Sequence, residues 1–217
     1  MRLLIKKELK LSTSPLAWWF LMFSLMTFIP GYPILMGAFF ICFGLFQSVQ
    51  SAREADDIIY SALLPIRKKD VVKAKYLVTV FFQMLGFLFI GVFAGIRMTA
   101  LSEVSAYVDN KLLAANLTYL GGVLLIYAAF NGIFLGGFFK TAYYYGKPFI
   151  FYIIVTVLIV GAFEAAWHFP NLHFLGESNP RALLLQVPVL LAAVVIYVGV
   201  TVVALKKAQK SFVKIDL

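Results

Sequence analysis

Long stretches without a charged residue dominate this chain. After Lys10 the next charged residue is Arg53, so 42 consecutive residues carry no charge. One helix of that length would extend about 63 Å, roughly twice the thickness of a bilayer core. Pro30 and Gly31 lie at the middle of the stretch, and this pair favours a turn. The pattern therefore predicts a hairpin of two membrane-spanning helices, at 11–29 and 34–52.

Four further apolar stretches follow, and each is near the roughly 20 residues that a spanning helix requires. They cover 76–96, 112–139, 148–169 and 182–205. The stretch 112–139 is longer than needed, so we expect part of it to tilt or to lie outside the core. Six spans place both ends of the chain on one side of the membrane. We therefore predict an all-α integral membrane protein, with 1–217 forming a single transmembrane domain.

The basic residues predict which side that is. Sixteen of the nineteen fall on the side of the chain ends, and only Arg97, Lys111 and Arg181 fall on the other. Such a bias in short loops marks the cytoplasmic side. Both termini are therefore predicted to be cytoplasmic. The sixteen are Arg2, Lys6, Lys7, Lys10, Arg53, Arg67, Lys68, Lys69, Lys73, Lys75, Lys140, Lys147, Lys206, Lys207, Lys210 and Lys214.

The composition agrees with a membrane protein and excludes other classes. Hydrophobic residues make up 62% of the chain and charged residues 13%, against about 45–50% and about 25% in soluble domains. This excludes a soluble enzyme, a disordered chain and a secreted disulfide scaffold. The net charge of +9 then describes topology and contact with anionic membrane lipids, and we expect no nucleic-acid partner. Cys42 is the single cysteine, so there is no intrachain disulfide and no cysteine metal set.

The first ten residues have an amphipathic pattern. The four basic residues share one helical face, although Leu3 and Glu8 interrupt the pattern. Two interpretations stay open. The segment either rests as a short interfacial helix in the headgroup layer or extends the first transmembrane helix.

The loop 53–75 has the most informative polar sequence. Its acidic start, with Glu54, Asp56 and Asp57, is placed to cap a short helix that Pro65 ends. Asp70 is placed to cap the helix that becomes the third span. Apolar side chains four residues apart would form a ridge on the short helix. The helix either lies on the membrane surface or docks into a groove of a soluble partner. The ridge residues are Ile59, Tyr60, Leu63 and Leu64.

The chain lacks the usual motif for nucleotide chemistry. It contains no G-x-x-x-x-G-K-[ST] sequence, so we expect it to bind no cofactor of its own. The spans are almost free of ionisable groups, and Glu164 is the main exception. Glu164 and His168 would share a helix face, with His173 nearby, so an intramembrane metal-dependent hydrolase is one alternative. The H-E-x-x-H order is missing, and polar groups at a membrane boundary are the other interpretation.

Two pairs of glycines have a spacing of four residues. They are Gly91 with Gly95 and Gly132 with Gly136. Small residues at this spacing let helices approach closely. The pairs could pack helices within the chain or between protomers.

Two segments resemble type-2 ABC transporter permeases. One is the stretch from Leu63 to Tyr76, and the other is the basic segment from Leu4 to Leu9. The resemblance implies two separate ATP-binding-cassette ATPase subunits, which bind ATP and Mg²⁺, and a second membrane subunit that makes a homodimer or a heterodimer. It also implies that 54–64 is the coupling helix. The residues that would couple to the ATPases are Glu54, Asp56, Asp57, Ile59, Tyr60, Leu63, Leu64 and Arg67.

Within that family the small size of the chain resembles the permeases that export amphipathic or antimicrobial peptides, such as phenol-soluble modulins. The resemblance then implies a multi-pass protein of a bacterial cell membrane. The 98–110 segment is only a modest outer loop, so no large external domain recognises a cargo. Exporters of lipid-linked glycans, antibiotics and sodium use related subunits. A membrane interaction or immunity protein without transport is the remaining alternative.

Overall fold

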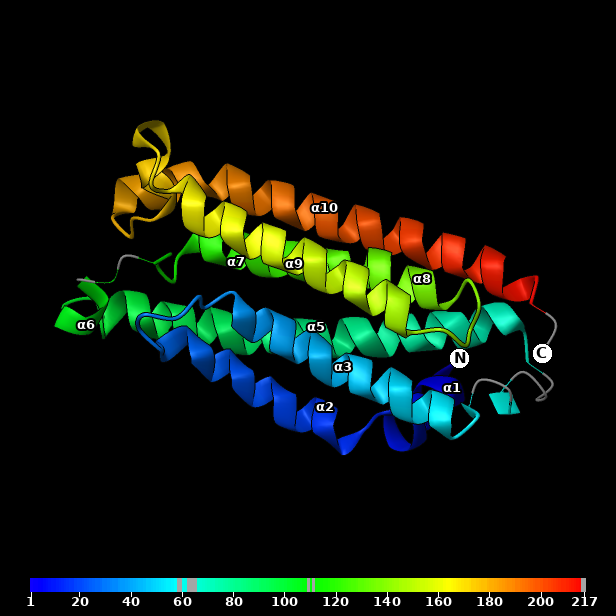
Figure 1. Cartoon of the computed structure of the whole chain (residues 1–217). Helices are drawn as coiled ribbons and strands as arrows, with labels where there is room; N and C mark the ends of the chain where they lie inside the picture. Colours follow the sequence, from blue (N-terminus) through cyan, green and yellow to red (C-terminus); the bar gives the residue numbers. More distant parts are fainter. Residues whose placement is uncertain (58–59, 62–65, 109, 111, 216–217) are drawn as a thin grey trace.

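The computed structural model describes residues 1–57, 60–61, 66–108, 110 and 112–215. All regular secondary structure in these residues is helical, which confirms the predicted all-α fold. Figure 1 shows α2, α3 and α5 in one half of the bundle and α7, α8, α9 and α10 in the other.

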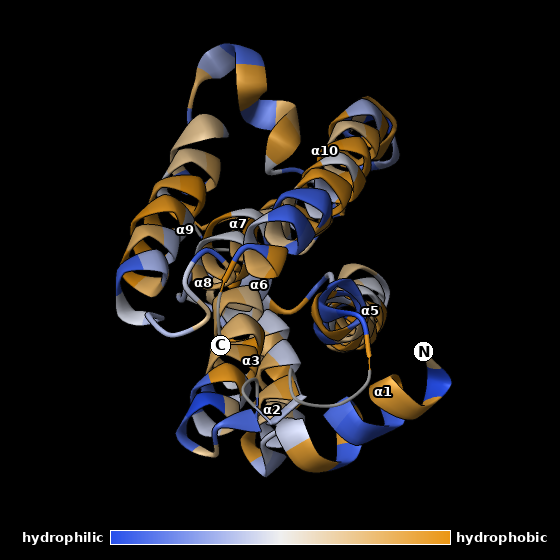
Figure 2. Ribbon diagram, turned by 90° about the vertical axis from the view of Figure 1, so that its right-hand side faces the viewer, coloured by the Kyte–Doolittle hydropathy of each residue, from blue (hydrophilic) through white to orange (hydrophobic). Residues whose placement is uncertain are grey.

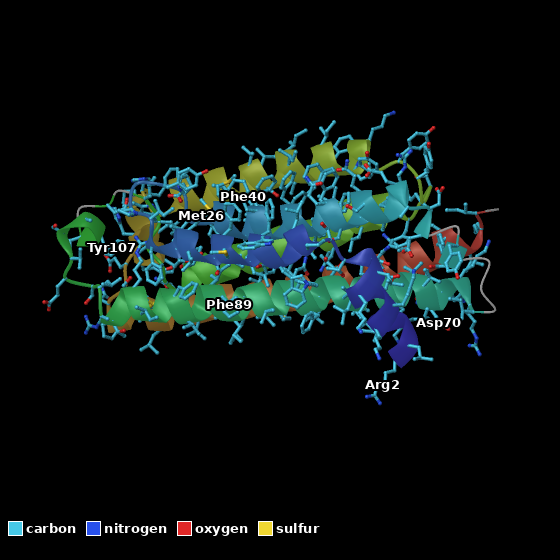
Figure 3. The ribbon with its side chains drawn as sticks, turned by 90° about the horizontal axis from the view of Figure 1, so that it is seen from below. Arg2, Met26, Phe40, Asp70, Phe89 and Tyr107 are labelled. Carbon is cyan, nitrogen blue, oxygen red and sulfur yellow. The ribbon has the colours of Figure 1, made fainter. Side chains whose placement is uncertain are left out.

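The N-terminal segment turns sharply before the first long helix. It consists of α1 (Arg2–Lys7) and the wider, π-helical η1 (Glu8–Ser12). Thr13 is extended, and α2 (Pro15–Phe20) follows at 88° to this segment. Figure 3 shows Arg2 at the tip of α1, directed away from the bundle. The segment therefore does not extend the line of the first span, and an interfacial position is the geometry that stays open.

The helix at the first predicted span has fewer residues than expected, but part of it has a larger rise per residue. The α2 helix continues into the 3₁₀-helical η2 (Leu21–Phe28). A 3₁₀-helix rises about 2.0 Å per residue against about 1.5 Å in an α-helix, so the two segments together extend about 25 Å. Because a 3₁₀-helix has three residues per turn, Leu21, Ser24 and Thr27 share one buried face.

A turn through Gly31 leads into α3 (Met36–Glu54), which packs closely on the first span. Gly31 has φ +71°, a conformation that glycine adopts without strain. A Cβ at Gly37 would lie 2.8 Å from the Phe23 carbonyl oxygen, and a Cβ at Gly44 would lie 2.6 Å from the Phe20 Cβ. These two glycines are seven residues apart and thus lie on one helix face. They let α3 approach α2 and η2.

Two helices are much longer than a bilayer crossing requires. The α5 helix (Lys68–Thr99) has 32 residues and α10 (Pro180–Val213) has 34, or about 48 and 51 Å. Both extend beyond the predicted spans at the same end of the bundle, where Lys69, Lys206 and Lys210 lie close together. We call this the basic end. The N-terminus and the C-terminal end of α10 lie at this same end, as six spans would require. Asp70 lies in the first turn of α5, whereas Arg67 occupies the N-cap without a side-chain hydrogen bond, so the predicted cap by Asp70 is wrong.

The remaining helices form the other half of the bundle. The α7 helix (Leu117–Ala129) begins after Asn116, which accepts a hydrogen bond from the Tyr119 N–H, and it continues through the π-helical η3 (Phe130–Leu135) into α8 (Gly136–Phe138). The α9 helix (Gly146–Ala166) follows. The short α6 (Ser105–Val108) and η4 (Pro170–Leu175) lie at the end opposite the termini.

The exposed surface of the bundle is strongly apolar. In the most hydrophobic windows of α9 and α10 only 17% of residues are buried, against 67% in Leu117–Phe138. Figure 2 shows α9 and α10 flanking the central α7 and α8. Water would not tolerate such a surface, but lipid does. The structure therefore describes a multi-pass membrane protein.

Among the described residues, four helices are long and apolar enough to cross a membrane, or five if the bent segments Arg2–Ser12 and Pro15–Phe28 together form one span. They are α5, the continuous Leu117–Phe138, α9 and α10. The α3 helix is not among them, since Gln47, Ser48, Gln50 and Ser51 lower the hydropathy of its last third. The count of six spans stays a prediction.

Candidate functional site

Four charged side chains form a closed ring at the basic end of the bundle. Lys7 pairs with Glu8 at 3.4 Å and with Asp57. Lys75 pairs with Glu8 at 3.3 Å and with Asp57 at 3.5 Å. Each cation thus contacts both anions, and the formal charges cancel. The four residues come from α1, η1, the segment after α3, and α5.

The ring is shielded from water and supported by hydroxyl groups. The exposed fractions of the Glu8 and Lys75 side chains are 3% and 8%, and that of Asp57 is 13%. The Ser12 hydroxyl donates to Asp57 Oδ2 at 2.9 Å, and Lys7 Nζ donates to Ser61 Oγ at 2.6 Å. Removing charges from water is costly unless each is paired and hydrogen-bonded. The complete pairing explains how this ring is tolerated.

The ring also changes the acidity of Asp57. Burial by itself would raise the pKa of the Asp57 carboxyl. The charge of Lys75, the hydrogen bond and charge of Lys7 and the hydrogen bond from Ser12 outweigh that effect and lower this pKa below its ordinary value of 3.8. Asp57 is therefore ionised at neutral pH and holds its place between the two lysines. We call Lys7, Glu8, Asp57 and Lys75 the charge ring.

The charge ring lies at the start of the predicted coupling helix. Asp56 has φ +49°, which is uncommon for a residue with a side chain, and its carbonyl accepts from the Tyr60 N–H at 2.9 Å. This turn directs the chain out of α3. Tyr60 is 62% exposed, as a residue of a docking ridge should be. The predicted ridge residues Ile59, Leu63 and Leu64 lie outside the described residues.

Two other predicted coupling residues, Glu54 and Arg67, are exposed. Glu54 is exposed and accepts a hydrogen bond from Gln50 Nε2 at 3.0 Å. Arg67 is exposed at the N-cap of α5. The Arg53 guanidinium lies 4.2 Å from the centre of the Tyr143 ring, which joins the end of α3 to the α8–α9 connection. In the described part of the chain, neither Glu54 nor Arg67 forms an ion pair with a residue of the charge ring.

The same end of α5 is fastened to the C-terminal segment. Lys68 Nζ donates to the Ile215 carbonyl at 2.6 Å, and Gln209 Nε2 donates to the Lys69 carbonyl at 3.0 Å. Both donors reach a backbone oxygen far away in sequence. The start of α5 therefore contacts the N-terminal segment through Lys75 and the C-terminal segment through Lys68.

The candidate hydrolase residues lie at the opposite end of the bundle. Glu164 Oε2 accepts a hydrogen bond from the Leu113 N–H at 2.8 Å and so fastens the start of the α7 segment to α9. His168 and His173 flank the Trp167 ring, with centroids 4.2 and 6.4 Å away. The described residues include no group of three His, Cys, Asp or Glu side chains that could hold a metal ion. Nothing in this geometry favours the hydrolase alternative.

Comparison with known protein families identifies the chain. Residues 3–207 match the family described as ABC-2 family transporter protein. The chain belongs to the ABC-2 transporter family. It matches no curated protein and no solved structure significantly.

Membership in the ABC-2 family confirms the resemblance to type-2 ABC transporter permeases. Proteins of this family are membrane subunits that are generally not themselves catalytic, and they associate with ATPase subunits in an ABC transporter. The match covers both the N-terminal segment and α5, so all four residues of the charge ring lie within it.

A second polar cluster lies in the middle of this ABC-2 protein. The side-chain amides of Gln83 and Asn131 bond reciprocally at 2.9 and 3.0 Å, and neither is exposed. Tyr197 donates to Gln83 Oε1 at 3.0 Å, and Asn131 Nδ2 donates to Thr201 Oγ1 at 3.0 Å. The cluster joins α5, η3 and α10. Asn131 therefore hydrogen-bonds across helices to both α5 and α10.

The four predicted glycines have different surroundings. A Cβ at Gly91 or at Gly95 would meet no atom within 4 Å. A Cβ at Gly132 would lie 2.9 Å from Val200 Cγ1 of α10, and a Cβ at Gly136 would lie 3.9 Å from the Tyr76 hydroxyl of α5. The second pair therefore contacts neighbouring helices, and the first faces outward from the chain.

At the end of the bundle opposite the N-terminus, Arg97 is bound within the ABC-2 protein. Its Nη1 donates to the Thr27 carbonyl at 2.7 Å, and its guanidinium lies 4.5 Å from the Tyr107 ring centre. The Tyr107 hydroxyl donates to the Phe28 carbonyl at 2.9 Å. Arg97 and Tyr107 line a pocket of about 350 Å³ together with Trp167.

Sequence reasoning missed three members of the charge ring and the close contacts of α3. It assigned Asp57 to the coupling helix but not Lys7, Glu8 or Lys75. The interruption of the basic N-terminal pattern by Glu8 was the available signal, since an acid there is unfavourable unless it meets a cation. The spacing of seven between Gly37 and Gly44 could have indicated the α3 contact.

Proposed function

We propose that this chain is the transmembrane subunit of an ATP-driven exporter and that 54–64 is its coupling helix. The charge ring carries the proposal. It connects Asp57, at the start of that helix, to α1 through Lys7 and to α5 through Lys75. A force on the coupling helix would then move these helices as one body instead of bending a loose loop.

The path for that motion continues along α5. Gln83 lies eight residues after Lys75, about 12 Å further along the helix, and its amide is bonded to η3 and α10. Rigid elements joined by polar contacts can transmit a rigid-body movement. We propose that ATP binding and hydrolysis in the partner shift α5 against α10 and so alternate the access of the cargo path.

The complex would contain two ATP-binding-cassette subunits, which bind ATP and Mg²⁺, and a second membrane subunit. Gly91 and Gly95 support the second membrane subunit, because their outward surface has room for the backbone of another helix. We propose six spans with cytoplasmic termini, with α3 as the second span. The N-terminus and the C-terminal end of α10 lie at the same end of the bundle, in agreement with this topology.

The cargo we propose is an amphipathic or antimicrobial peptide. Such a peptide partitions into a bilayer surface and can approach the subunit laterally. The support is the resemblance to small peptide-exporting permeases, together with the broad apolar surface of α9 and α10. Location in a bacterial cell membrane follows from the same resemblance.

Reconstitution with a candidate ATP-binding-cassette ATPase, sought first among the genes adjacent to that of this chain, tests the function. We expect the two to co-purify, amphipathic peptide to stimulate ATP hydrolysis, and peptide to enter vesicles only when ATP is present. If the complex forms but ATP never drives peptide movement, the interaction or immunity alternative replaces the proposal.

Two variants separate docking from coupling. Leu63→Asp places a charge on the predicted ridge, so we expect it to abolish co-purification of the ATPase. Asp57→Asn leaves the ridge intact but opens the charge ring, so the ATPase should still bind while peptide-stimulated hydrolysis falls several-fold. Glu103→Gln, an exposed acid at the opposite end of the bundle, is the control and should leave both properties unchanged. Normal coupling in Asp57→Asn would contradict the role of the ring.

A further inference from the structure

A cleft of about 450 Å³ opens between α8, α9 and α10 near the basic end. Lys140, Lys147 and Lys207 line it together with the Ser211 hydroxyl. Each lysine comes from a different segment of the chain: the end of the α8 region, the start of α9 and the late part of α10. All three are exposed, and among the described residues none forms an ion pair.

An apolar groove continues from this cleft toward the middle of the bundle. A neighbouring hollow of about 310 Å³ shares Gly132, Ala204 and Lys207 with the cleft and extends along α10 past Val203 to Gly199. From Lys207 to Gly199 the helix rises about 12 Å. The joined cavity is therefore cationic at one end and apolar over the next 12 Å or so.

Glycines shape the walls of this groove. A Cβ at Gly137 would lie 2.8 Å from the Pro148 Cβ, so α8 and the start of α9 touch at the floor. A Cβ at Gly199 would meet nothing within 4 Å, so the space beside α10 is open at that point. Figure 2 shows α9 and α10 on either side of the central helices that form the floor.

The charge in the cleft favours an anion. No acidic side chain of the described part of the chain lines it. No side chain caps the start of α9 there, so the partial positive charge of that helix end adds to the three ammonium groups. Three ammonium groups and a hydroxyl match a phosphate, and the adjoining groove matches a hydrocarbon chain.

We propose that this cleft binds one anionic phospholipid, with its phosphate between Lys140, Lys147 and Lys207 and one acyl chain along α10 toward Gly199. The lipid would connect the α8–α9 connection to α10. No ion pair among the described residues joins these two segments. The site does not depend on the ATPase or on the cargo.

A second basic surface shows why lysines alone do not define the site. A cleft of about 480 Å³ beside it is lined by Lys69, Lys206, Lys210 and Lys214. It has more lysines, but its lining includes only one apolar side chain, that of Val213. It offers attraction to any anionic surface without a place for an acyl chain, and it therefore provides a matched control.

The test is lipid titration of the purified full-length chain, followed by native mass spectrometry. Phosphatidylglycerol is the probe, phosphatidylcholine with the same acyl chains is the zwitterionic comparison, and glycerol 3-phosphate represents the headgroup alone. We expect one phosphatidylglycerol to bind at least tenfold more tightly than phosphatidylcholine, and glycerol 3-phosphate to bind far more weakly.

Three sets of variants locate the bound lipid. Lys140→Gln, Lys147→Gln and Lys207→Gln together should weaken phosphatidylglycerol binding about tenfold or more. Lys206→Gln, Lys210→Gln and Lys214→Gln remove equal charge from the control surface and should change it less than threefold. Gly199→Leu fills the open groove without removing charge and should also weaken binding. Elution as a single sharp peak checks that each variant is folded.

Several outcomes would overturn the proposal. Equal affinity for the two lipids, or equal loss in the two triple variants, would mean general surface attraction. Tight binding of glycerol 3-phosphate would mean a soluble anion site. If Val203→Cys, in a Cys42→Ala background, forms a disulfide between two copies in membranes, a second copy covers the groove instead.

Discussion

Glu8 and Lys75 form an ion pair of 3.3 Å across 67 residues of sequence, although both side chains are more than nine-tenths buried. Glu8 belongs to η1 and Lys75 to α5. The pair closes the charge ring and holds the bent N-terminal segment against the long helix that leads into the membrane. A hinge on either side of this pair would separate the proposed coupling helix from the bundle.

The ring should behave as a unit, and a double-mutant cycle can measure this. We expect Lys75→Gln and Asp57→Asn each to lower the free energy of unfolding by about 2 kcal/mol, since each leaves a partly buried charge with fewer partners. The double variant should lose about 1 kcal/mol less than the sum. Thermal unfolding in detergent measures the three values, with Glu103→Gln as the control. Strict additivity would mean that the two charges do not interact.

Stability should depend on pH through Asp57. Its pKa is lower in the folded protein than the ordinary value of 3.8. Well above pH 3.8 the Asp57 carboxyl is ionised in both the folded and the unfolded protein, so the stabilisation is fully present. As the pH falls through 3.8 and below, the unfolded state binds the proton first and the stabilisation is lost. The melting temperature of the unmodified protein should therefore approach that of Asp57→Asn in acid, and a constant difference from pH 7 to pH 3 would contradict this.

The central amide pair should contribute to stability inside the membrane. Asn131→Leu removes a partner of Gln83 and leaves a buried amide with fewer hydrogen bonds. Polar contacts between membrane helices contribute about 0.6 to 2 kcal/mol, so we expect a loss of about 1 kcal/mol or slightly more. Thr201→Val, which removes only the outermost hydrogen bond of the cluster, should cost less. The same melting measurement compares them, and a larger effect of Thr201→Val would contradict the assigned geometry.

Two glycine substitutions should have opposite consequences. Gly44→Ala places a methyl group 2.6 Å from the Phe20 Cβ, so α3 must move away, at a cost of about 1–3 kcal/mol. Gly91→Ala meets nothing within 4 Å and should leave the isolated chain as stable or slightly more stable, because alanine favours helices. Melting temperatures of the monomeric fraction check both. If Gly44→Ala is harmless, the α2–α3 contact is looser than described.

Hydropathy predicted the helices well because the membrane acts on each segment separately. The predicted stretches 76–96, 148–169 and 182–205 overlap α5, α9 and α10, and each needs only enough apolar residues to cross. The predicted positions of the helix ends were less accurate. The first span begins at Pro15, after Thr13 breaks the helix, and α10 continues to Val213 because Ala208 and Phe212 remain buried.

The sites that combine distant residues could not be read in this way. Asp57 is predicted to belong to the coupling helix from the acidic start of the loop 53–75 and from the family resemblance. Lys7 fits a basic interfacial face equally well and Lys75 fits a positive-inside loop, while Glu8 shows only as an interruption of the basic N-terminal pattern. Their pairing depends on the 88° bend, and no local pattern specifies the direction in which a chain turns.

The sequence by itself determined that this is an all-helical membrane protein, and its residues placed it in the ABC-2 family, because transfer into a bilayer depends on local composition. Only the tertiary structure decided which polar groups meet. The charge ring, the Gln83–Asn131 pair and the lysine-lined cleft each join segments far apart in the chain. Their formation depends on helix length, rotation and close packing, which a one-dimensional pattern of hydropathy does not specify.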